Sequence, residues 1–160
     1  MKYFIAIALF CIRFSTVAQS NLNKYKYIVV PVRFQDFKKD NEYNSSTLAK
    51  YLLVQKGFSV VYENAMPEDL VFNRCLGLYL KMNKNSGVFT TKISFSFNDC
   101  HSKEVFVTQE GRSGEKDYNI AYKESFKMAM ESLNFNYEYD KKQSVKPLKV
   151  SYKNDVKNLE

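Results

Sequence analysis

The sequence predicts an α+β fold, a two-layer sandwich in which a mixed, mostly antiparallel sheet of about five strands carries two helices on one face (β-α-β-β-β-α). Apolar and polar residues alternate along 75–82 and again along 89–98, on either side of a turn that contains Gly87. This period of two is that of a half-buried strand. Segments 46–56 and 118–133 each carry one apolar stripe at helical spacing, so both helices can pack on the same side of the sheet.

The first third of the chain predicts a strand, a helix and a second strand. Residues 25–32 are rich in β-branched and aromatic side chains, and Pro31 suits a strand end or edge because it has no amide donor. The Asn-Ser-Ser run at 44–46 can cap a helix, and Gly57 can end it in the left-handed conformation. A second strand at 58–63 would complete a parallel, right-handed β-α-β unit. The residues at helical spacing are Leu48, Tyr51, Leu52 and Gln55.

The middle of the chain predicts a hairpin with one apolar and one polar face. A short helix that begins at Pro67 precedes it. The apolar set includes Leu76, Leu78, Leu80, Met82, Phe89, Ile93, Phe95 and Phe97. The polar set would face water or a partner, and five of its members form the predicted interaction face: Tyr79, Lys81, Lys92, Ser94 and Ser96.

The last third predicts one more strand and a closing helix. Residues 103–110 continue as a third antiparallel strand, and 111–116 read as a polar loop. Asp117 can cap the closing helix. The alternating aromatic residues of 135–139 predict a frayed helix end or a short edge strand, with a segment that docks on a partner as the alternative. The helix stripe comprises Tyr118, Tyr122, Phe126, Ala129, Met130 and Leu133.

Three segments of the chain differ in composition. Residues 1–18 combine a positive start, a short apolar run and small residues before Gln19, which is the pattern of a cleaved signal peptide. The run is too short for a membrane-spanning helix, and no later stretch approaches that length, so we expect no integral membrane span after cleavage. Residues 19–140 predict a single domain, and 141–160 predict a basic, disordered tail. The mature protein is therefore expected to be exported, either periplasmic or secreted.

The net charge of +7 does not indicate a nucleic-acid-binding protein. Lys2 and Arg13 lie in the predicted leader, and 141–160 hold six lysines against two acids, which leaves about +1 for 19–140. A nucleic-acid-binding domain normally carries its basic charge as a stripe on the folded body. The distribution therefore predicts no nucleic-acid partner.

Two cysteines, Cys75 and Cys100, remain once the leader with Cys11 is removed. If opposed residues of the hairpin have numbers that sum to an odd constant, these two cysteines share the polar face and are close to cross-strand neighbours. In an oxidising compartment they predict a structural disulfide. The rival is a metal or thiol site that combines Cys75 with Asp99, Cys100 and His101, but the spacing fits no zinc pattern. We therefore expect no metal and no cofactor.

No group of residues in the sequence indicates a particular type of catalysis. His101 is the single histidine, so a Ser-His or Cys-His mechanism would have to run through it. The carboxylates are scattered, and the glycines form no phosphate-binding loop. The sequence therefore predicts no catalytic residues. An extracytoplasmic hydrolase that uses His101 or the acids, and a polysaccharide- or peptide-binding module that uses Tyr79, Phe135, Tyr137 and Tyr139, stay as alternatives.

Several short segments carry a family resemblance. They are Tyr-Ile-Val-Val-Pro at 27–31, Leu-Ala-Lys-Tyr-Leu-Leu at 48–53, Pro-Glu-Asp-Leu at 67–70, Asn-Arg-Cys at 73–75, Asp-Cys at 99–100, Arg-Ser-Gly-Glu-Lys-Asp-Tyr at 112–118 and Ala-Tyr-Lys-Glu at 121–124. Over about residues 25–135 the chain resembles a family of small, uncharacterised exported bacterial proteins. The resemblance implies export and fold, and no activity.

A weaker similarity, in element order alone, is to periplasmic α/β domains of envelope-assembly and secretion lipoproteins. It implies an accessory or scaffolding role, although this chain lacks a lipid-attachment cysteine. The leading expectation is thus a non-catalytic binding or accessory domain of the cell envelope, which contacts an envelope partner through its sheet face or edge.

Overall fold

The computed structural model describes residues 22–134 and 137–142, and within them it confirms the predicted α+β fold. The predicted leader and all but the first two residues of the predicted tail lie outside these residues. The strands are β1 (Tyr27–Val30), β2 (Val60–Tyr62), β3 (Gly77–Lys84), β4 (Thr91–Asn98), β5 (Glu104–Val107) and β6 (Gly111–Ser113). The helices are α3 (Ser45–Gln55), α4 (Glu68–Phe72) and α5 (Tyr118–Glu131), with short 3-10 turns η2 (Leu22–Lys24), η3 (Glu42–Asn44) and η4 (Arg74–Leu76).

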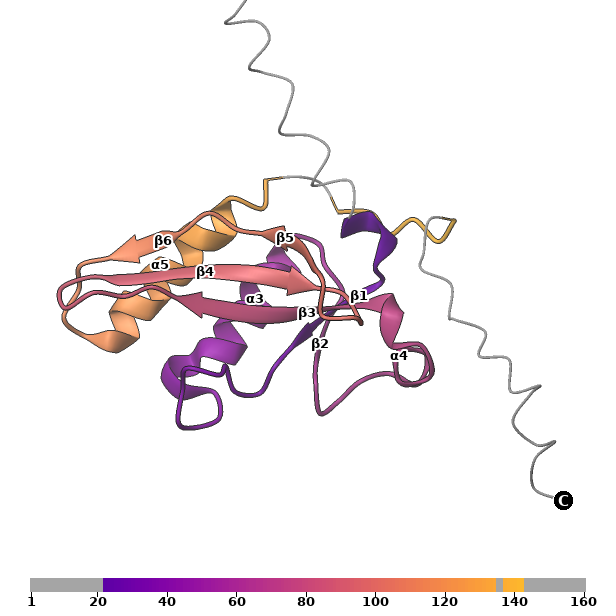
Figure 1. The fold of residues 1–160 in the computed structure, drawn as a ribbon, viewed down its shortest axis with the longest axis horizontal. Helices are drawn as coiled ribbons and strands as arrows, with labels where there is room; N and C mark the ends of the chain where they lie inside the picture. Colours follow the sequence, from indigo (N-terminus) through magenta and orange to yellow (C-terminus); the bar gives the residue numbers. More distant parts are fainter. Residues whose placement is uncertain (1–21, 135–136, 143–160) are drawn as a thin grey trace, which may run out of the picture.

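The sheet is mixed, as predicted. Its order is β2-β1-β3-β4-β5, and β6 also pairs with β4. β1 pairs in parallel with β2 and with β3, which matches the parallel β-α-β unit expected from the sequence. The later pairs are antiparallel. Figure 1 shows α3 and α5 as a second layer behind the sheet.

The core fills the space between the sheet and these two helices. Phe95 of β4 packs edge-on against Phe126 of α5, with ring centroids 4.8 Å apart, and edge-to-face contacts of this kind add to the gain from burial. The fully buried side chains include Ile28, Leu53, Leu78, Ile93, Phe95, Phe97, Phe126, Met130 and Leu133. The predicted apolar set of the hairpin supplies the β3 and β4 part of this core, apart from two residues at its ends. Leu76 precedes β3, and Phe89 precedes β4 and is 88% exposed.

The first long helix, α3, differs from its predicted form at both its cap and its stripe. Asn44 occupies the cap position without a side-chain hydrogen bond, and the Asn41 carboxamide oxygen instead accepts from the amide of Thr47 at 3.0 Å. The buried residues include Ala49 and Leu53, whereas Tyr51 is 56% exposed. The stripe is shifted because α3 packs against α5 as well as the sheet, and small residues permit the closest approach.

The ends of both long helices confirm other predictions. Gly57 follows α3 with φ +88°, the left-handed conformation that glycine adopts without strain. The Asp117 carboxylate caps α5 by accepting from the amides of Asn119 at 2.7 Å and Ile120 at 3.4 Å. On α5 the predicted stripe is buried, except that Tyr118 is 57% exposed at the first turn.

Two features correct the predicted layout. The segment expected as a polar loop at 111–116 contains β6, which pairs with β4 through Arg112 and Lys92. The face of the sheet opposite the core is also partly covered, because Leu70 of α4 packs against Gly77 and Val29 there. Among the described residues, no helix has the length and apolar character needed to cross a membrane.

Candidate functional site

The face of the sheet that α3 and α5 leave uncovered carries the predicted interaction residues. This open face comprises Tyr79, Lys81 and Asn83 of β3 with Lys92, Ser94 and Ser96 of β4, and the register pairs Lys81 with Ser96 and Asn83 with Ser94. The strand period places all of them on one side of the sheet.

One of the five predicted interaction residues is not accessible. Ser96 is 2% exposed, and its hydroxyl accepts a hydrogen bond from the Asn83 carboxamide at 3.2 Å. Lys81 is exposed, while Tyr79, Lys92 and Ser94 are half-buried. Ser96 is covered because it lies in the central strand β4 between Lys81 on β3 and Val107 on β5, so its neighbours on both sides close over a small side chain.

The α4 helix bounds the open face on the side of β1. The Lys26 ammonium lies 2.5 Å from the Asp69 carboxylate, and the Tyr27 hydroxyl donates to the same carboxylate at 3.1 Å. The hydrogen bond from Lys26 lowers the pKa of Asp69 below its ordinary value. These contacts hold α4 over the neighbouring apolar residues and leave the β3–β4 part of the face free.

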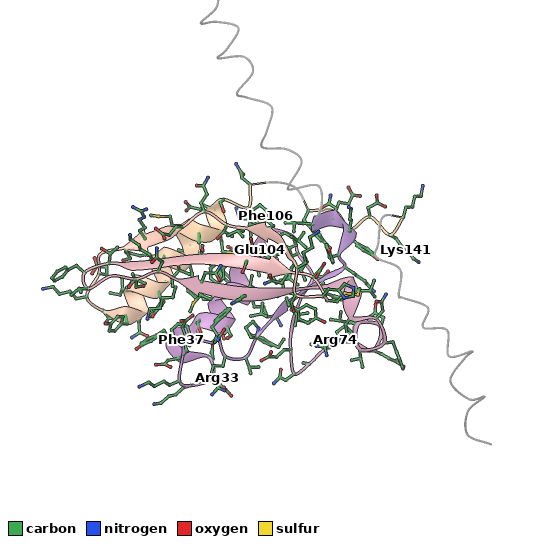
Figure 2. All side chains as sticks on the ribbon, viewed as in Figure 1. Arg33, Phe37, Arg74, Glu104, Phe106 and Lys141 are labelled. Carbon is green, nitrogen blue, oxygen red and sulfur yellow. A yellow bond between two sulfur atoms is a disulfide. The ribbon has the colours of Figure 1, made fainter. Side chains whose placement is uncertain are left out.

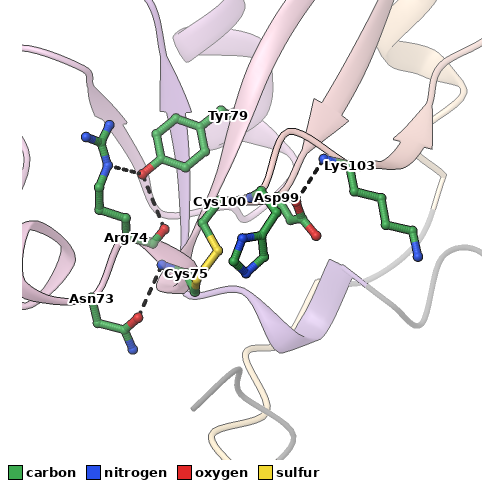
Figure 3. Close-up of a disulfide and its surroundings, with 8 residues drawn as sticks. Asn73, Arg74, Cys75, Tyr79, Asp99, Cys100 and Lys103 are labelled. Atoms are coloured by element: carbon green, nitrogen blue, oxygen red, sulfur yellow. Dashed lines mark hydrogen bonds between the residues drawn. A yellow bond between two sulfur atoms is a disulfide. The ribbon is translucent and has the colours of Figure 1, made fainter. Parts of the chain in front are cut away.

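A hollow of about 550 Å³ opens on this face next to α4. Within it, the Arg74 guanidinium Nε donates to the Tyr79 hydroxyl at 3.2 Å, and that hydroxyl can donate to the Arg74 carbonyl at 3.3 Å (Figure 3). Arg74 lies at the α4 end of the molecule (Figure 2). The hollow is lined by Arg74, Tyr79, Leu80, Lys81, Asn98, Asp99, Cys100 and Ser102.

A disulfide joins Cys75 and Cys100 at the edge of the hollow, with Cα atoms 4.9 Å apart. Opposed residues of β3 and β4, such as Tyr79 and Asn98, have numbers that sum to the odd constant 177. This is the parity from which the sequence placed the two cysteines on one face. In Figure 3 the bridge links the turn before β3 to the turn after β4, and thus ties the base of the hairpin.

Side chains next to both cysteines hold the local backbone. The Asn73 carboxamide oxygen accepts from the amide of Cys75 at 3.2 Å. The Asp99 carboxylate Oδ1 accepts from the amides of His101 and Lys103, each at 2.9 Å. Asp99 therefore organises the turn after β4, as aspartate commonly does.

His101 lies beside the disulfide. The sulfur atoms of Cys75 and Cys100 and a ring nitrogen of His101 lie within 4.8 Å of one another. Among residues 22–134 and 137–142 this is the one group of three metal-type ligands. With its sulfurs bonded to each other, the group offers a metal no thiolate, and thiolates are the form in which cysteine binds metals.

Two of the aromatic residues suggested for polysaccharide or peptide binding, Tyr79 and Tyr137, lie on different surfaces. The Tyr137 hydroxyl donates to the carbonyl of Tyr25 at 2.5 Å, and its ring lies 4.4 Å from that of Phe58. Burial raises the pKa of Tyr137 to about 12. Tyr137 thus packs on the core, where the sequence suggested a frayed helix, an edge strand or a docking segment, whereas Tyr79 lies on the open face. Phe135 lies outside the described residues.

Sequence reasoning missed Arg74 as a member of this site. The sequence named Arg74 only as part of the family resemblance. The one feature that could have indicated a place at this site is its position next to Cys75. Its side chain reaches the open face because the turn η4 precedes β3 directly.

Comparisons with known proteins add only a distant likeness in fold. No family model and no curated protein match the chain. Two solved structures are similar to it: PelC dodecamers from Paraburkholderia phytofirmans in two crystal forms, one of them a point variant. Each is 12% identical in sequence and covers 72% of this chain, with 91% and 90% of the other chain covered and TM-scores of 0.46 and 0.45. Similarity at this level carries no argument about function or assembly.

Proposed function

We propose that this protein is an exported, non-catalytic binding domain of the bacterial cell envelope, and that its open face engages an acidic surface of an envelope protein. The observation that carries the proposal is the pairing of Arg74 with Tyr79 beside Lys81, on the polar β3–β4 part of the sheet face that α4 leaves free. Export rests on the leader pattern and on the disulfide, since disulfides persist in oxidising compartments.

The charges of this site favour an acidic partner. Arg74 and Lys81 are both exposed and line the same hollow, and Lys92 lies further along the face. The one carboxylate of the hollow, on Asp99, accepts two amides of its own turn. A guanidinium already oriented by a phenol loses less side-chain freedom when it binds a carboxylate than a free arginine would.

The geometry suits binding better than proton transfer. In the hollow the Tyr79 hydroxyl bonds to Arg74, and the Asp99 carboxylate accepts two amides of its own turn, so neither group is arranged as a nucleophile with a base. The disulfide closes the end of the hairpin beside them. A pre-formed, cross-linked surface of this kind lowers the ordering cost of association.

Site-specific photo-crosslinking tests this proposal. A photoreactive amino acid at Lys81 should capture an envelope protein in intact cells, and the same group at Lys127, exposed on α5 on the opposite side of the sheet, should not. Arg74→Glu should weaken the Lys81 adduct by about tenfold or more, because it places like charge against the partner. Lys127→Glu is the matched charge reversal and should leave the adduct unchanged.

Three results would overturn the proposal. The first is an equal yield of adduct from both positions. The second is a yield from Lys81 that Arg74→Glu does not change. The third is an adduct whose captured component resists protease. The last result would indicate a polysaccharide partner instead. Circular dichroism of each variant establishes that the fold is intact.

A further inference from the structure

The turn between β3 and β4 displays two of the most exposed apolar side chains of the described structure. Val88 is 91% exposed and Phe89 is 88% exposed. Figure 1 places this turn at one extreme of the long axis of the molecule, away from α4. We call residues 85–90 the tip. Among the described residues, no other element buries these two side chains.

The tip is a formed turn. The amide of Asn85 donates to the Lys92 carbonyl at 3.0 Å, and the amide of Gly87 donates to the Thr90 carbonyl at 2.9 Å. The Ser86 hydroxyl accepts from the amide of Lys92 at 3.0 Å. These bonds support the backbone on both sides of the apex, so Val88 and Phe89 are held out from the sheet.

Basic and tyrosine side chains surround the tip. A hollow of about 400 Å³ beside it is lined by Val88 and Phe89 together with Lys84, Lys116 and Tyr118. Lys84 and Lys116 are exposed, as is Tyr118 at 57%. Glu115 is the one acid of this lining. An apolar apex above cations and a tyrosine is the distribution expected of a group that enters the interfacial region of a bilayer.

The opposite end of the molecule supplies a contrast. Val71 and Phe72 of α4 are also exposed, at 59% and 80%. Their nearest charges along the helix are the acids Glu68 and Asp69. The cations at this end already have partners, because Lys26 pairs with Asp69 and Arg74 with Tyr79. An anionic membrane should therefore attract this end less than the tip.

We propose that the tip docks on an anionic phospholipid bilayer, with Val88 and Phe89 inserted below the head groups and Lys84 and Lys116 in contact with them. Apolar side chains gain free energy on leaving water, and lysines near an anionic surface add an electrostatic attraction. A bilayer suits a convex apex because it deforms around the inserted groups, whereas a protein partner would need a matching cleft. The open face stays free, so the inference does not depend on the proposed function.

Tryptophan fluorescence gives a local test, because the chain contains no tryptophan. Phe89→Trp places a single reporter at the tip, and Phe72→Trp places one on α4 as the matched control. With the full-length protein and vesicles of equal parts phosphatidylglycerol and phosphatidylcholine, we expect a blue shift for Phe89→Trp and none for Phe72→Trp. High salt or pure phosphatidylcholine should weaken the shift. A reporter at the tip distinguishes this contact from vesicle binding through the chain termini.

Vesicle flotation gives the second measurement. Val88→Ser/Phe89→Ser should lower the partition coefficient by about tenfold or more, and Lys84→Gln/Lys116→Gln should remove most of its salt dependence. Val71→Ser/Phe72→Ser, a matched loss of one valine and one phenylalanine, should change neither. The proposal is overturned by an unshifted Phe89→Trp spectrum, by an equal shift at both reporters, or by equal effects of the two serine pairs. An unshifted spectrum together with tip-dependent capture of a protein would assign the tip to a protein partner.

Discussion

Gly111 of β6 lies directly against the backbone of α5 at Ser125. A Cβ atom on residue 111 would overlap the Ser125 carbonyl oxygen and would stand 2.7 Å from the Ala129 amide nitrogen. The Ser125 hydroxyl in turn donates to the Thr91 carbonyl of β4 at 3.2 Å. A glycine inside a strand often marks such a close approach of two backbones, and here it lets the closing helix lie flat on the sheet.

The first prediction is that Gly111→Ala destabilises the fold by about 3 kcal/mol or more, since helix and strand must separate to admit a methyl group. Urea denaturation followed by circular dichroism measures the change in the free energy of unfolding. Gly114→Ala is the control, because a Cβ there meets nothing within 4 Å, and its effect should stay within about 0.5 kcal/mol. Equal stabilities of the two variants would contradict the close contact.

The second prediction concerns the bridge between Cys75 and Cys100, which lie 25 residues apart in sequence. Loss of the bridge should lower the free energy of unfolding by about 3 kcal/mol, because the unfolded chain regains the freedom of the closed loop. The measurement compares the protein with Cys75→Ser/Cys100→Ser in urea.

Thiol titration of the denatured, unreduced protein provides the accompanying check. The processed chain should release no free thiol, and an unprocessed chain should release the one thiol of Cys11. Two additional free thiols would show that the bridge does not form in the cell.

The third prediction is a dependence of stability on pH that runs through Asp69. Because Lys26 lowers the pKa of Asp69 in the folded state, this carboxylate stabilises the fold above its unfolded pKa of about 3.9, and the gain is lost as the pH falls further. Both side chains are about 40% exposed, which limits the effect to about 1 kcal/mol or less. Asp69→Asn should therefore flatten the stability profile between neutral and acidic pH.

A double-mutant cycle with Lys26→Met separates the ion pair from other effects of Asp69→Asn. If the two residues interact as described, their combined cost should be smaller than the sum of the single costs. Additive costs, or an unchanged pH profile in Asp69→Asn, would argue against the interaction.

The fourth prediction is that Tyr137→Phe lowers the free energy of unfolding by about 1–2 kcal/mol, because the carbonyl of Tyr25 loses its donor while the ring contact with Phe58 is kept. Tyr139→Phe serves as the control and should have little effect. Because burial raises the pKa of Tyr137 to about 12, the folded state favours the neutral phenol and loses stability as the pH rises past the ordinary phenol value of about 10. Denaturation at two alkaline pH values should show a shallower loss for Tyr137→Phe than for the unchanged protein.

The β3–β4 hairpin shows what the alternation of apolar and polar residues can predict and what it cannot. Alternation along 75–82 and 89–98 correctly placed Leu78, Leu80, Ile93, Phe95 and Phe97 in the core, because the strand period follows from backbone geometry alone. The same alternation included Phe89, which precedes β4 and is exposed. Periodicity assigns a face, but it does not tell where a strand begins.

Helix ends and short strands were predicted unevenly. Gly57 and Asp117 act as expected, since each depends on its immediate neighbours. Asn44 makes no side-chain cap, because the more distant Asn41 accepts the helix amide. β6 was read as a loop because its three residues, Gly-Arg-Ser, have turn composition, and its pairing partner β4 is distant in the sequence.

The amino-acid order by itself determined the type of each element apart from β6, the shared face of the two cysteines and the polar character of the open face, since each follows from spacing within one strand, one helix or one hairpin. Tertiary structure alone decided that Ser96 is covered, that α4 closes over Gly77, and that Arg74 joins Tyr79 at the hollow. Whether a surface residue is covered depends on which distant segment of the chain packs against it. The spacing of residues within one strand or helix does not predict which segment that is.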